Sequence, residues 1–354
     1  VGIKNVIMSD YLNKHSLILF IIISFILHCI TSYFSFGFYS QDEHFQVLSP
    51  VEQLLGLNNN LKNEIWEFSD EYKIRPWFQS YFYYYIINLL KAFNIESPFI
   101  WTFVLKLFSS LFGLIAVIYF YLTFKNIFFN DNIFNKLIIF LFFFFPYFHA
   151  RTSSENLGTS FFIFGLIIFY NLINKIYIQK YIIKSILCGI FLGLAIITRY
   201  QILIFIFPLY LWVLIFNISL LNLIKLFVIG LSILLVLILG IIIDSVGYGS
   251  LNITYYNYFY ANFVGGMLNF FGSDPWWYYF YEVTVKFAPP IGLVFLIALF
   301  SLFIKNYKNI IIFISIFYLL TFSLISHKEI RFLFPLFFFT PFIICNFLDK
   351  FNHL

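Results

Sequence analysis

Charged residues are scarce in this chain: Asp, Glu, Lys and Arg together make up 10% of its 354 residues. Hydrophobic residues make up 62% and aromatic residues 24%. A soluble globular domain has too little interior to bury that much apolar surface. The composition therefore excludes a soluble enzyme. Repeated apolar runs of about 17–25 residues predict an all-α polytopic membrane protein.

Cysteine is also scarce, and the three cysteines at positions 29, 188 and 345 all fall in apolar segments without metal-type spacing. The chain has no Gly-rich nucleotide loop and no Ser/His/Asp pattern. We therefore expect no metal and no cofactor. The net charge of +5 comes from lysines in short loops rather than from a basic patch, which argues against a nucleic-acid partner.

The apolar segments alternate with two longer polar stretches, at residues 36–76 and 244–286. The segments cover residues 17–34, 77–93, 99–124, 137–149, 157–172, 182–198, 202–216, 223–243, 290–304, 310–325 and 332–347. The basic loops 125–136, 175–184 and 305–308 belong in the cytosol by the positive-inside rule. These three loops lie together on the cytosolic side only if segment 77–93 does not cross the membrane, and lies in the interface or re-enters. The alternative is that segment 77–93 crosses the membrane. The sequence then predicts one membrane domain, residues 1–354, with about 10–11 transmembrane helices.

Arginine is rarer than lysine, and all four arginines fall on the predicted outer side of the membrane: Arg75, Arg151, Arg199 and Arg331. The positive-inside rule predicts the opposite distribution, so another requirement holds them there. An arginine supplies a permanent charge and a planar fork of donors that fits phosphate or carboxylate. The alternative is that each one snorkels or pairs locally, as Arg151 would with Glu155 at helical spacing.

An acidic pair, Asp42-Glu43, stands where the chain first leaves the membrane, in the outer loop 36–76. Either carboxylate is a candidate general base for a hydroxyl nucleophile; a solvated loop acid or a helix cap is the alternative. Trp66 lies in the segment 65–77 that ends the same loop, and it either stacks on a sugar or sits in the headgroup belt. In the outer segment 326–331, His327, Lys328 and Arg331 form a candidate phosphate clamp at the start of a helix.

Several of these motifs together resemble glycosyltransferase family 22, the α-mannosyltransferases of GPI-anchor and dolichol-linked oligosaccharide assembly. Asp42-Glu43-His44-Phe45-Gln46 resembles the Asp-Glu-x-x-Gln signature that follows the first helix in that family. Further similar stretches follow in order: Trp66-Glu67-Phe68 with Arg75, then Arg151-Thr152-x-Ser154-x-Asn156, Asp274-Pro275-Trp276 and His327-Lys328-Glu329-x-Arg331-Phe332-x-x-Pro335. The stretch 45–52 is most similar to the GPI branch. The similarity covers most of the chain.

The resemblance implies a GT-C-type fold whose long first extracytoplasmic loop forms the active site. It implies transfer from dolichyl-phosphate-mannose with inversion at the anomeric carbon, and it maps the catalytic base onto Asp42 with Glu43 beside it. We assign donor-phosphate binding to His327, Lys328, Arg331, Arg151 and Arg199. We assign acceptor and sugar binding to Gln46, Trp66, Glu67, Arg75, Asp274 and Trp276.

The sequence thus predicts a glycosyltransferase that moves mannose, or another hexose, from a polyprenyl- or dolichyl-phosphate sugar to a lipid-linked glycan. Its partners would be that donor, that acceptor and membrane lipids. Its location would be the endoplasmic reticulum membrane in a eukaryote or the inner membrane in a bacterium. Two rivals remain open: a lipid-linked glycan flippase or transporter, and a non-catalytic subunit of a glycan-assembly complex.

Overall fold

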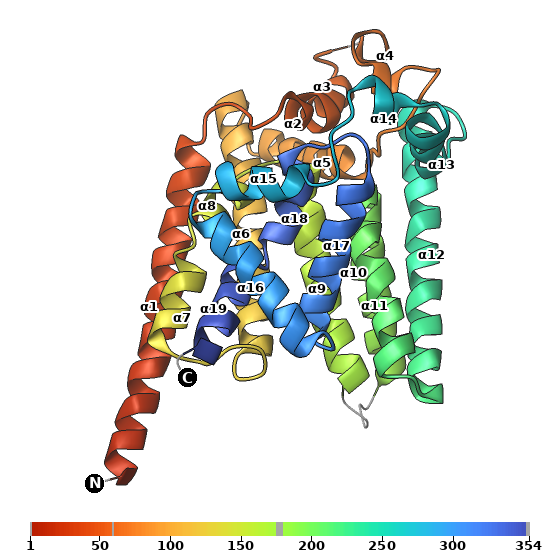
Figure 1. Ribbon diagram of the computed structural model, residues 1–354. Coiled ribbons are helices and arrows are strands. Elements are labelled where there is room, and N and C mark those ends of the chain that lie inside the picture. The colour runs from red at the N-terminus through yellow and green to blue at the C-terminus, as the bar shows by residue number, and fades with distance from the viewer. Residues whose placement is uncertain (1, 59, 175–179, 352–354) are drawn as a thin grey trace.

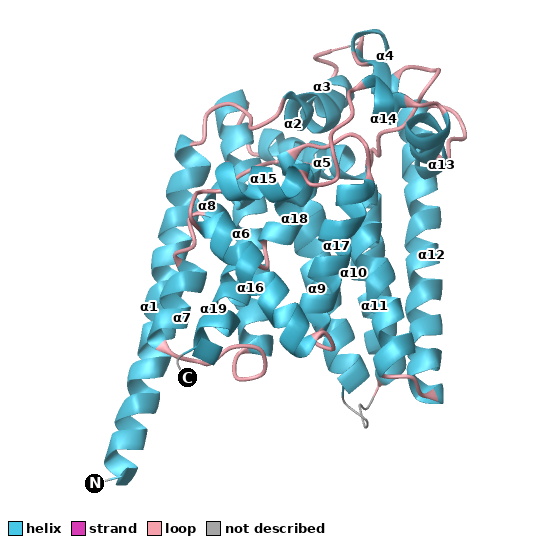
Figure 2. Cartoon of the chain, viewed as in Figure 1, coloured by secondary structure: helices cyan, strands magenta, loops and turns pink. Residues whose placement is uncertain are grey.

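The computed structural model describes residues 2–58, 60–174 and 180–351, with side chains described within residues 15–350 of these ranges. Helices dominate these residues, and no strand occurs among them apart from one isolated bridge between Lys125 and Phe129 (Figure 2). The predicted all-α polytopic class is therefore confirmed. Residues 175–179 of the basic loop 175–184 lie outside the described part of the chain.

Five helices in the described residues are long and apolar enough to cross a membrane, and they run side by side along the height of the molecule (Figure 1). They are α1 (Gly2–Phe34), α6 (Pro98–Phe124), α9 (Ser154–Asn174), α10 (Tyr181–Thr198) and α12 (Leu220–Tyr248). Since polar backbone groups must be satisfied inside a bilayer, long uninterrupted helices are the expected solution for such apolar runs.

Shorter apolar helices complete the bundle. They are α7 (Ile133–Phe140) with α8 (Phe144–His149), α11 (Leu203–Phe216), α16 (Ile291–Asn306), α17 (Ile310–Leu324), and α18 (Phe334–Phe337) with α19 (Thr340–Phe351). The last apolar segment is broken, because residues 330–337 and 340–350 meet at an angle of 56°. The predicted number of crossings stays a prediction for these shorter pieces.

Short helices of the two polar stretches gather at one end of the bundle, opposite the N-terminus (Figure 1). The first stretch forms α2 (Gln41–Glu43), η1 (His44–Leu48), α3 (Ser49–Leu54), α4 (Leu61–Glu64) and η2 (Trp66–Phe68), and leads into α5 (Phe78–Ala92). The second forms α13 (Thr254–Phe259), η4 (Tyr260–Val264), α14 (Met267–Phe270) and α15 (Tyr278–Val285). Helix α5 lies at this same end, beside α3, whereas α6 runs down the bundle. This placement agrees with an interfacial segment 77–93.

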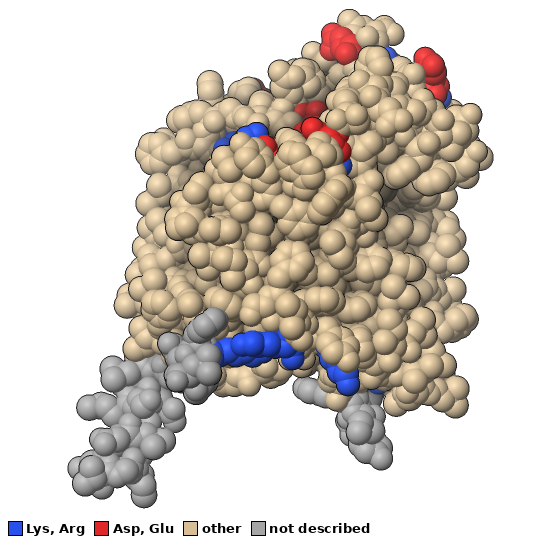
Figure 3. Space-filling view, in the orientation of Figure 1, with Lys and Arg blue, Asp and Glu red and all other residues tan. Residues whose placement is uncertain are grey.

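Charge is divided between the two ends of the molecule. In the space-filling view, acidic groups gather at the end that carries the short helices, and lysines line the rim of the opposite end (Figure 3). The apolar band between them carries almost no charge on this face. We therefore call the end with the short helices the outer end and the other the inner end, in line with the positive-inside rule.

Close helix packing fixes the position of α10, whose last residue directly precedes Arg199. A Cβ added at Gly189 in α10 would lie 2.5 Å from the carbonyl oxygen of Ile229 in α12. A Cβ added at Gly165 in α9 would lie 2.5 Å from a side-chain carbon of Leu192 in α10. Small residues thus let α10 approach both neighbours, as is common between membrane helices. The outer end of α10 is held between them.

Candidate functional site

Asp42 and Arg331 meet at the outer end although they are far apart in the sequence. The Ser40 side chain caps α2 by accepting a hydrogen bond from the Asp42 backbone N–H. An Asp42 carboxylate oxygen lies 2.6 Å from Arg331 Nη2, and Arg331 Nη1 donates to Ser40 Oγ at 3.0 Å. The broken helix at residues 330–337 brings Arg331 to this point. The first outer loop and the last apolar segment therefore build one site.

Arg331 is shared between two carboxylates. Its Nε and Nη2 donate to the two oxygens of Glu329 at 2.6 and 2.9 Å, in addition to the pair with Asp42. His327 Nε2 lies 3.1 Å from Glu329. Burial raises the pKa of Asp42, but the charges of Arg331 and Arg75 and the hydrogen bond from Arg331 outweigh it and hold the pKa below its ordinary value. Asp42 is thus an ionised carboxylate at neutral pH.

Glu43, the neighbour of Asp42, points in a different direction and is 4% exposed. Its Oε1 accepts hydrogen bonds from the backbone N–H of Thr152 at 2.7 Å and from the Thr152 hydroxyl at 2.9 Å. Burial raises the pKa of Glu43 more than these hydrogen bonds lower it. The two adjacent acids therefore have different surroundings: Glu43 anchors α2 to the segment before α9, and Asp42 faces the site.

A second ion pair joins Glu67 and Arg75, which the sequence grouped with the acceptor. Arg75 Nη2 donates to Glu67 Oε1 in a very short contact. Gln46 Nε2 donates to the same oxygen at 3.3 Å. The guanidinium of Arg75 also lies over the ring of Tyr258, 5.8 Å from its centre. The first outer loop thus contributes an arginine that the second outer loop covers.

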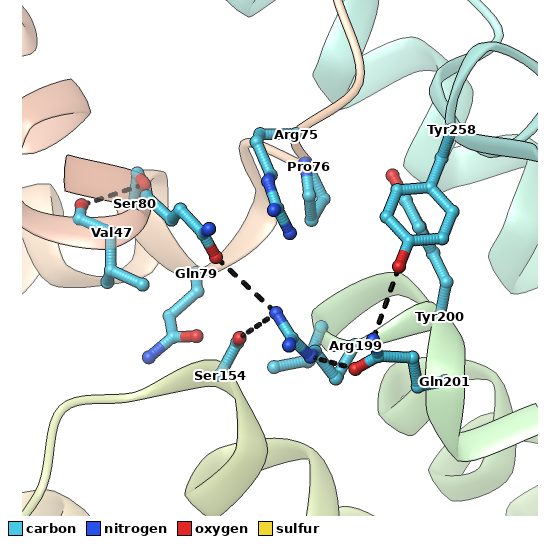
Figure 4. A pocket seen from close by; sticks show the side chains of 12 residues that line it. Val47, Arg75, Pro76, Gln79, Ser80, Ser154, Arg199, Tyr200, Gln201 and Tyr258 are labelled. Carbon is cyan, nitrogen blue, oxygen red and sulfur yellow. Dashed lines mark hydrogen bonds between the residues drawn. The ribbon is translucent and has the colours of Figure 1, made fainter. Parts of the chain in front are cut away.

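A third ion pair holds Arg199, which follows α10 directly. Arg199 Nη2 lies 2.9 Å from Glu155, and its Nε donates to Gln201 at 2.6 Å. Its Nη1 donates to Gln46 and to Ser154, each at 3.4 Å. Figure 4 shows the hydrogen bonds of Arg199 with Ser154 and Gln201, with the side chain of Arg75 directed toward the same space. Glu155 therefore pairs with Arg199, and not with Arg151 as the helical spacing had offered as an alternative.

All three ion pairs contribute to the lining of one cavity of about 860 Å³, the third through Arg199 alone. Its charged part is formed by Asp42, Glu64, Glu67, Arg75, Arg199, His327, Glu329 and Arg331. Its apolar part runs along the bundle and is formed by Ile196, Leu203, Ile204, Ile233, Leu237, Phe322 and Ile325, from α10, α11, α12 and α17 and the residue after α17. Trp66 and Phe271 lie at the outer side, with ring centres 5.8 Å apart. The cavity is therefore charged at one end and apolar at the other.

Five residues that the sequence assigned to substrate do not line this cavity, and one of them, Gln46, lines the smaller pocket beside it. Lys328 is 5% exposed, and its Nζ donates to the backbone carbonyls of Asp274, Ile325 and Ser326, so it ties the second outer loop to the end of α17. Arg151 donates to the Gly37 carbonyl at 3.1 Å and lies over the Tyr147 ring. Asp274 and Trp276 also lie outside the lining, and Trp276 is 65% exposed. Their positions give no support to the expected contacts with the donor or the acceptor.

Several residues of the site were not singled out as site residues by the sequence reasoning. Ser40, Thr152, Ser154, Glu155, Gln201 and Tyr258 all bond directly to a charged or amide side chain of the site. Gln201 also donates to the Tyr258 hydroxyl at 3.2 Å. The polar run 151–156 carried a signal for Thr152, Ser154 and Glu155, but Gln201 and Tyr258 gave none. Within the described ranges, no three His, Cys, Asp or Glu residues are grouped so that they could hold a metal ion.

Comparison with known proteins identifies the family of the chain. The family model of the Alg9-like mannosyltransferases matches residues 16–353. The chain belongs to the Alg9-like mannosyltransferase family. The resemblance to glycosyltransferase family 22 is therefore confirmed, and the chain is an all-α polytopic membrane protein of that family.

Individual relatives match over shorter stretches. "GPI mannosyltransferase 3" of Candida albicans is 32% identical over 106 residues, which is 30% of this chain and 20% of that protein. "GPI alpha-1,2-mannosyltransferase 3" of Bos taurus is 33% identical over 99 residues, 27% of this chain and 18% of that protein. The matched stretches thus cover about a fifth of these relatives' own length. No solved structure matches the chain.

Proposed function

We propose that this protein transfers mannose from a dolichyl- or polyprenyl-phosphate sugar to a lipid-linked glycan at the outer face of its membrane. The family supports a mannosyltransferase. The relatives named for GPI mannosyltransfer support a GPI-type acceptor and the endoplasmic reticulum membrane as the location. The observation that carries the proposal is the cavity, because it joins a cluster of arginines to an apolar channel among the membrane helices. A sugar phosphate on a long isoprenoid chain has the same division between an anionic head and an apolar tail.

The proposed reaction is a single displacement with inversion. The hydroxyl oxygen of the acceptor attacks C1 of the sugar while the bond from C1 to the phosphate oxygen breaks. The carboxylate of Asp42 takes the hydroxyl proton, and the phosphate leaves on its lipid as an anion. Arg331 binds one Asp42 oxygen, and no residue in the described ranges bonds the other, so that oxygen is available as the base. The cationic side chains of the cavity stabilise the departing phosphate.

The acceptor is assigned to the outer side of the cavity. Trp66 offers an indole face there, at the edge of the charged part, and aromatic faces stack well on sugar rings. Gln46 and Glu67 bond to each other and to the arginines, so they order the charged part around the reacting atoms. No metal and no cofactor enter this proposal, since the lipid-phosphate sugar is itself the donor substrate.

The test compares two donors with the purified protein in lipid vesicles. Radiolabelled mannose is supplied either on dolichyl phosphate or on GDP, together with a GPI-type glycolipid acceptor. The proposal expects label in the acceptor only from the lipid donor. Transfer from GDP-mannose alone would reject a lipid-linked donor. Binding of both substrates without any transfer would favour the non-catalytic subunit, and movement of the unchanged glycolipid across the vesicle would favour a flippase.

A further inference from the structure

The three arginines of the cavity differ in how many of their donor groups are already used. Arg199 is occupied on every side: Nε bonds Gln201, Nη1 bonds Gln46 and Ser154, and Nη2 pairs with Glu155. A ligand reaches that guanidinium only by displacing these partners. Since a buried carboxylate left without its partner is costly, Arg199 is poorly placed to change partners.

Arg331 is almost as fully occupied. Its Nε and Nη2 hold both oxygens of Glu329, Nη2 also holds Asp42, and Nη1 donates to Ser40. An incoming anion at Arg331 would compete with Asp42 and Glu329 for the same donors. Arg331 therefore serves first to orient Asp42.

Arg75 is different, because part of its guanidinium has no partner within the described ranges. Its Nη2 donates to Glu67, but its Nε is buried and has no hydrogen-bond partner among the residues that the structure describes. Arg75 lines the large cavity and also a side pocket of about 20 Å³ between Gln79 and Tyr258. A buried donor without a partner is unusual and costs free energy unless a ligand or a water satisfies it.

The backbone around Arg75 is fixed, so the unpaired donor has a defined position. The Tyr248 hydroxyl at the outer end of α12 accepts from the Arg75 N–H at 3.1 Å and donates to the Arg75 carbonyl at 2.9 Å. Two residues later, the backbone N–H of Trp77 donates to Asp244 at 2.8 Å. Both anchors belong to α12, whose side chains also line the apolar part of the cavity. The anion-binding fork and the apolar channel therefore share one support.

We propose that Arg75 is the main anchor for a phosphate group bound in this cavity, with Glu67 as the internal competitor that occupies the fork when the site is empty. This inference rests on the proposed function, because it takes the phosphate to be that of the lipid-linked donor. It reassigns Arg75 from binding of the acceptor to binding of the donor phosphate. It gives Arg199 a positioning role, in which its pair with Glu155 shapes the site without contacting the phosphate.

The experiment measures binding of citronellyl phosphate, a short isoprenoid phosphate, to the purified protein in detergent. Arg75→Ala removes the anchor and is expected to weaken binding about tenfold or more, since hydrogen bonds to charged groups are among the strong ones. Glu67→Gln removes the competing charge and is expected to tighten binding by about threefold or more. The matched control is Lys73→Ala in the same loop: Lys73 pairs with Asp70, does not line the cavity, and its loss should leave binding unchanged.

The opposite directions of the two variants separate anion binding from misfolding. If both Arg75→Ala and Glu67→Gln weaken binding alike, or if Arg75→Ala binds as the unaltered protein does, the assignment of Arg75 is overturned while the proposed function stands. If the unaltered protein binds citronellyl phosphate no better than citronellol, the lipid-phosphate donor fails together with this inference. If inorganic phosphate competes with citronellyl phosphate at equal concentration, the cavity is a site for free phosphate, and a lipid-linked phosphate is rejected as its ligand.

Discussion

The outer and inner ends of the molecule each hold a cluster of charged and amide side chains, but the two clusters are built differently. At the inner end, Asp131 accepts from the Tyr121 hydroxyl at 2.6 Å and pairs with Lys136 at 2.9 Å and Lys125 at 3.2 Å. Asp349 there accepts hydrogen bonds from the asparagines at positions 130, 132 and 135. These residues line neither cavity described above. The inner cluster closes on itself and ties α6, α7 and α19 together.

At the outer end, the ion pairs surround a cavity, and two groups of the residues that line it remain unpaired in the described part of the chain. One is the second oxygen of Asp42 and the other is Nε of Arg75, neither of which has a partner among the described residues. The difference shows what separates a structural cluster from a reactive one in the same membrane protein. Within the described ranges, the structural cluster pairs its charged groups with one another and leaves only the amide oxygen of Asn135 unpaired, whereas the reactive cluster leaves selected charged groups for the substrate. Substitution should therefore cost stability at the inner end and activity at the outer end.

The largest expected effect is on transfer by Asp42→Asn. An amide keeps the size of the side chain but cannot take up the hydroxyl proton, so we expect kcat to fall by about 10²–10⁴-fold, the usual contribution of a general base. Binding of the donor should change little. The measurement is initial-rate transfer from labelled dolichyl-phosphate-mannose at saturating substrate. Full activity in this variant would remove Asp42 as the base.

Sequence reasoning could place the two halves of the site on one side of the membrane, because few charges occur and the positive-inside rule orders the loops. It could not show that Lys328 faces backbone carbonyls, since a clamp and a loop anchor have the same residue types at a helix start. It also offered a local pair between Arg151 and Glu155, which the structure replaces with Arg199. That contact depends on how the end of α10 packs on α9, and the spacing of residues in the sequence does not predict packing between helices.

Asp131→Asn makes the same substitution at the inner end, where we expect it to affect stability and not activity. It removes a charge that Lys136 and Lys125 face, so we expect a loss of about 1–3 kcal/mol in stability. The activity of the remaining folded protein should stay close to the original. The measurements are the thermal midpoint in detergent and the transfer rate per folded molecule. A large loss of kcat with an unchanged midpoint would break the comparison between the two ends.

Glu43→Gln tests the contrast within the acidic pair and should have a small effect. The glutamine carbonyl oxygen can accept the same two hydrogen bonds from Thr152 that Glu43 accepts, so α2 keeps its place. We expect transfer within about tenfold of the original, far from the loss in Asp42→Asn. Glu43→Ala, which removes the acceptor altogether, should lower both the thermal midpoint and the rate. A rate for Glu43→Gln as low as that of Asp42→Asn would assign the base to Glu43.

The fall of kcat/KM at acid pH distinguishes Asp42 from Glu43 without any substitution. Over the usual assay range, the expected change in kcat/KM is the smallest of the effects considered. A base must be deprotonated to act. The pKa of Asp42 lies below its ordinary 3.8 because Arg331 and Arg75 outweigh the effect of burial, so kcat/KM should stay level as the pH falls toward 4 and drop only below it. The pKa of Glu43 is raised above its ordinary 4.5 by burial, so a Glu43 base would place the drop in kcat/KM above that value.

The stability of the fold should not interfere with this measurement. The Asp42–Arg331 pair stabilises the fold above the ordinary pKa of Asp42, and this stabilisation is lost below it, so the protein should remain folded throughout the pH range that distinguishes the two carboxylates. A fall of kcat/KM above pH 4.5 in protein with an unchanged thermal midpoint would therefore rule out Asp42 as the base.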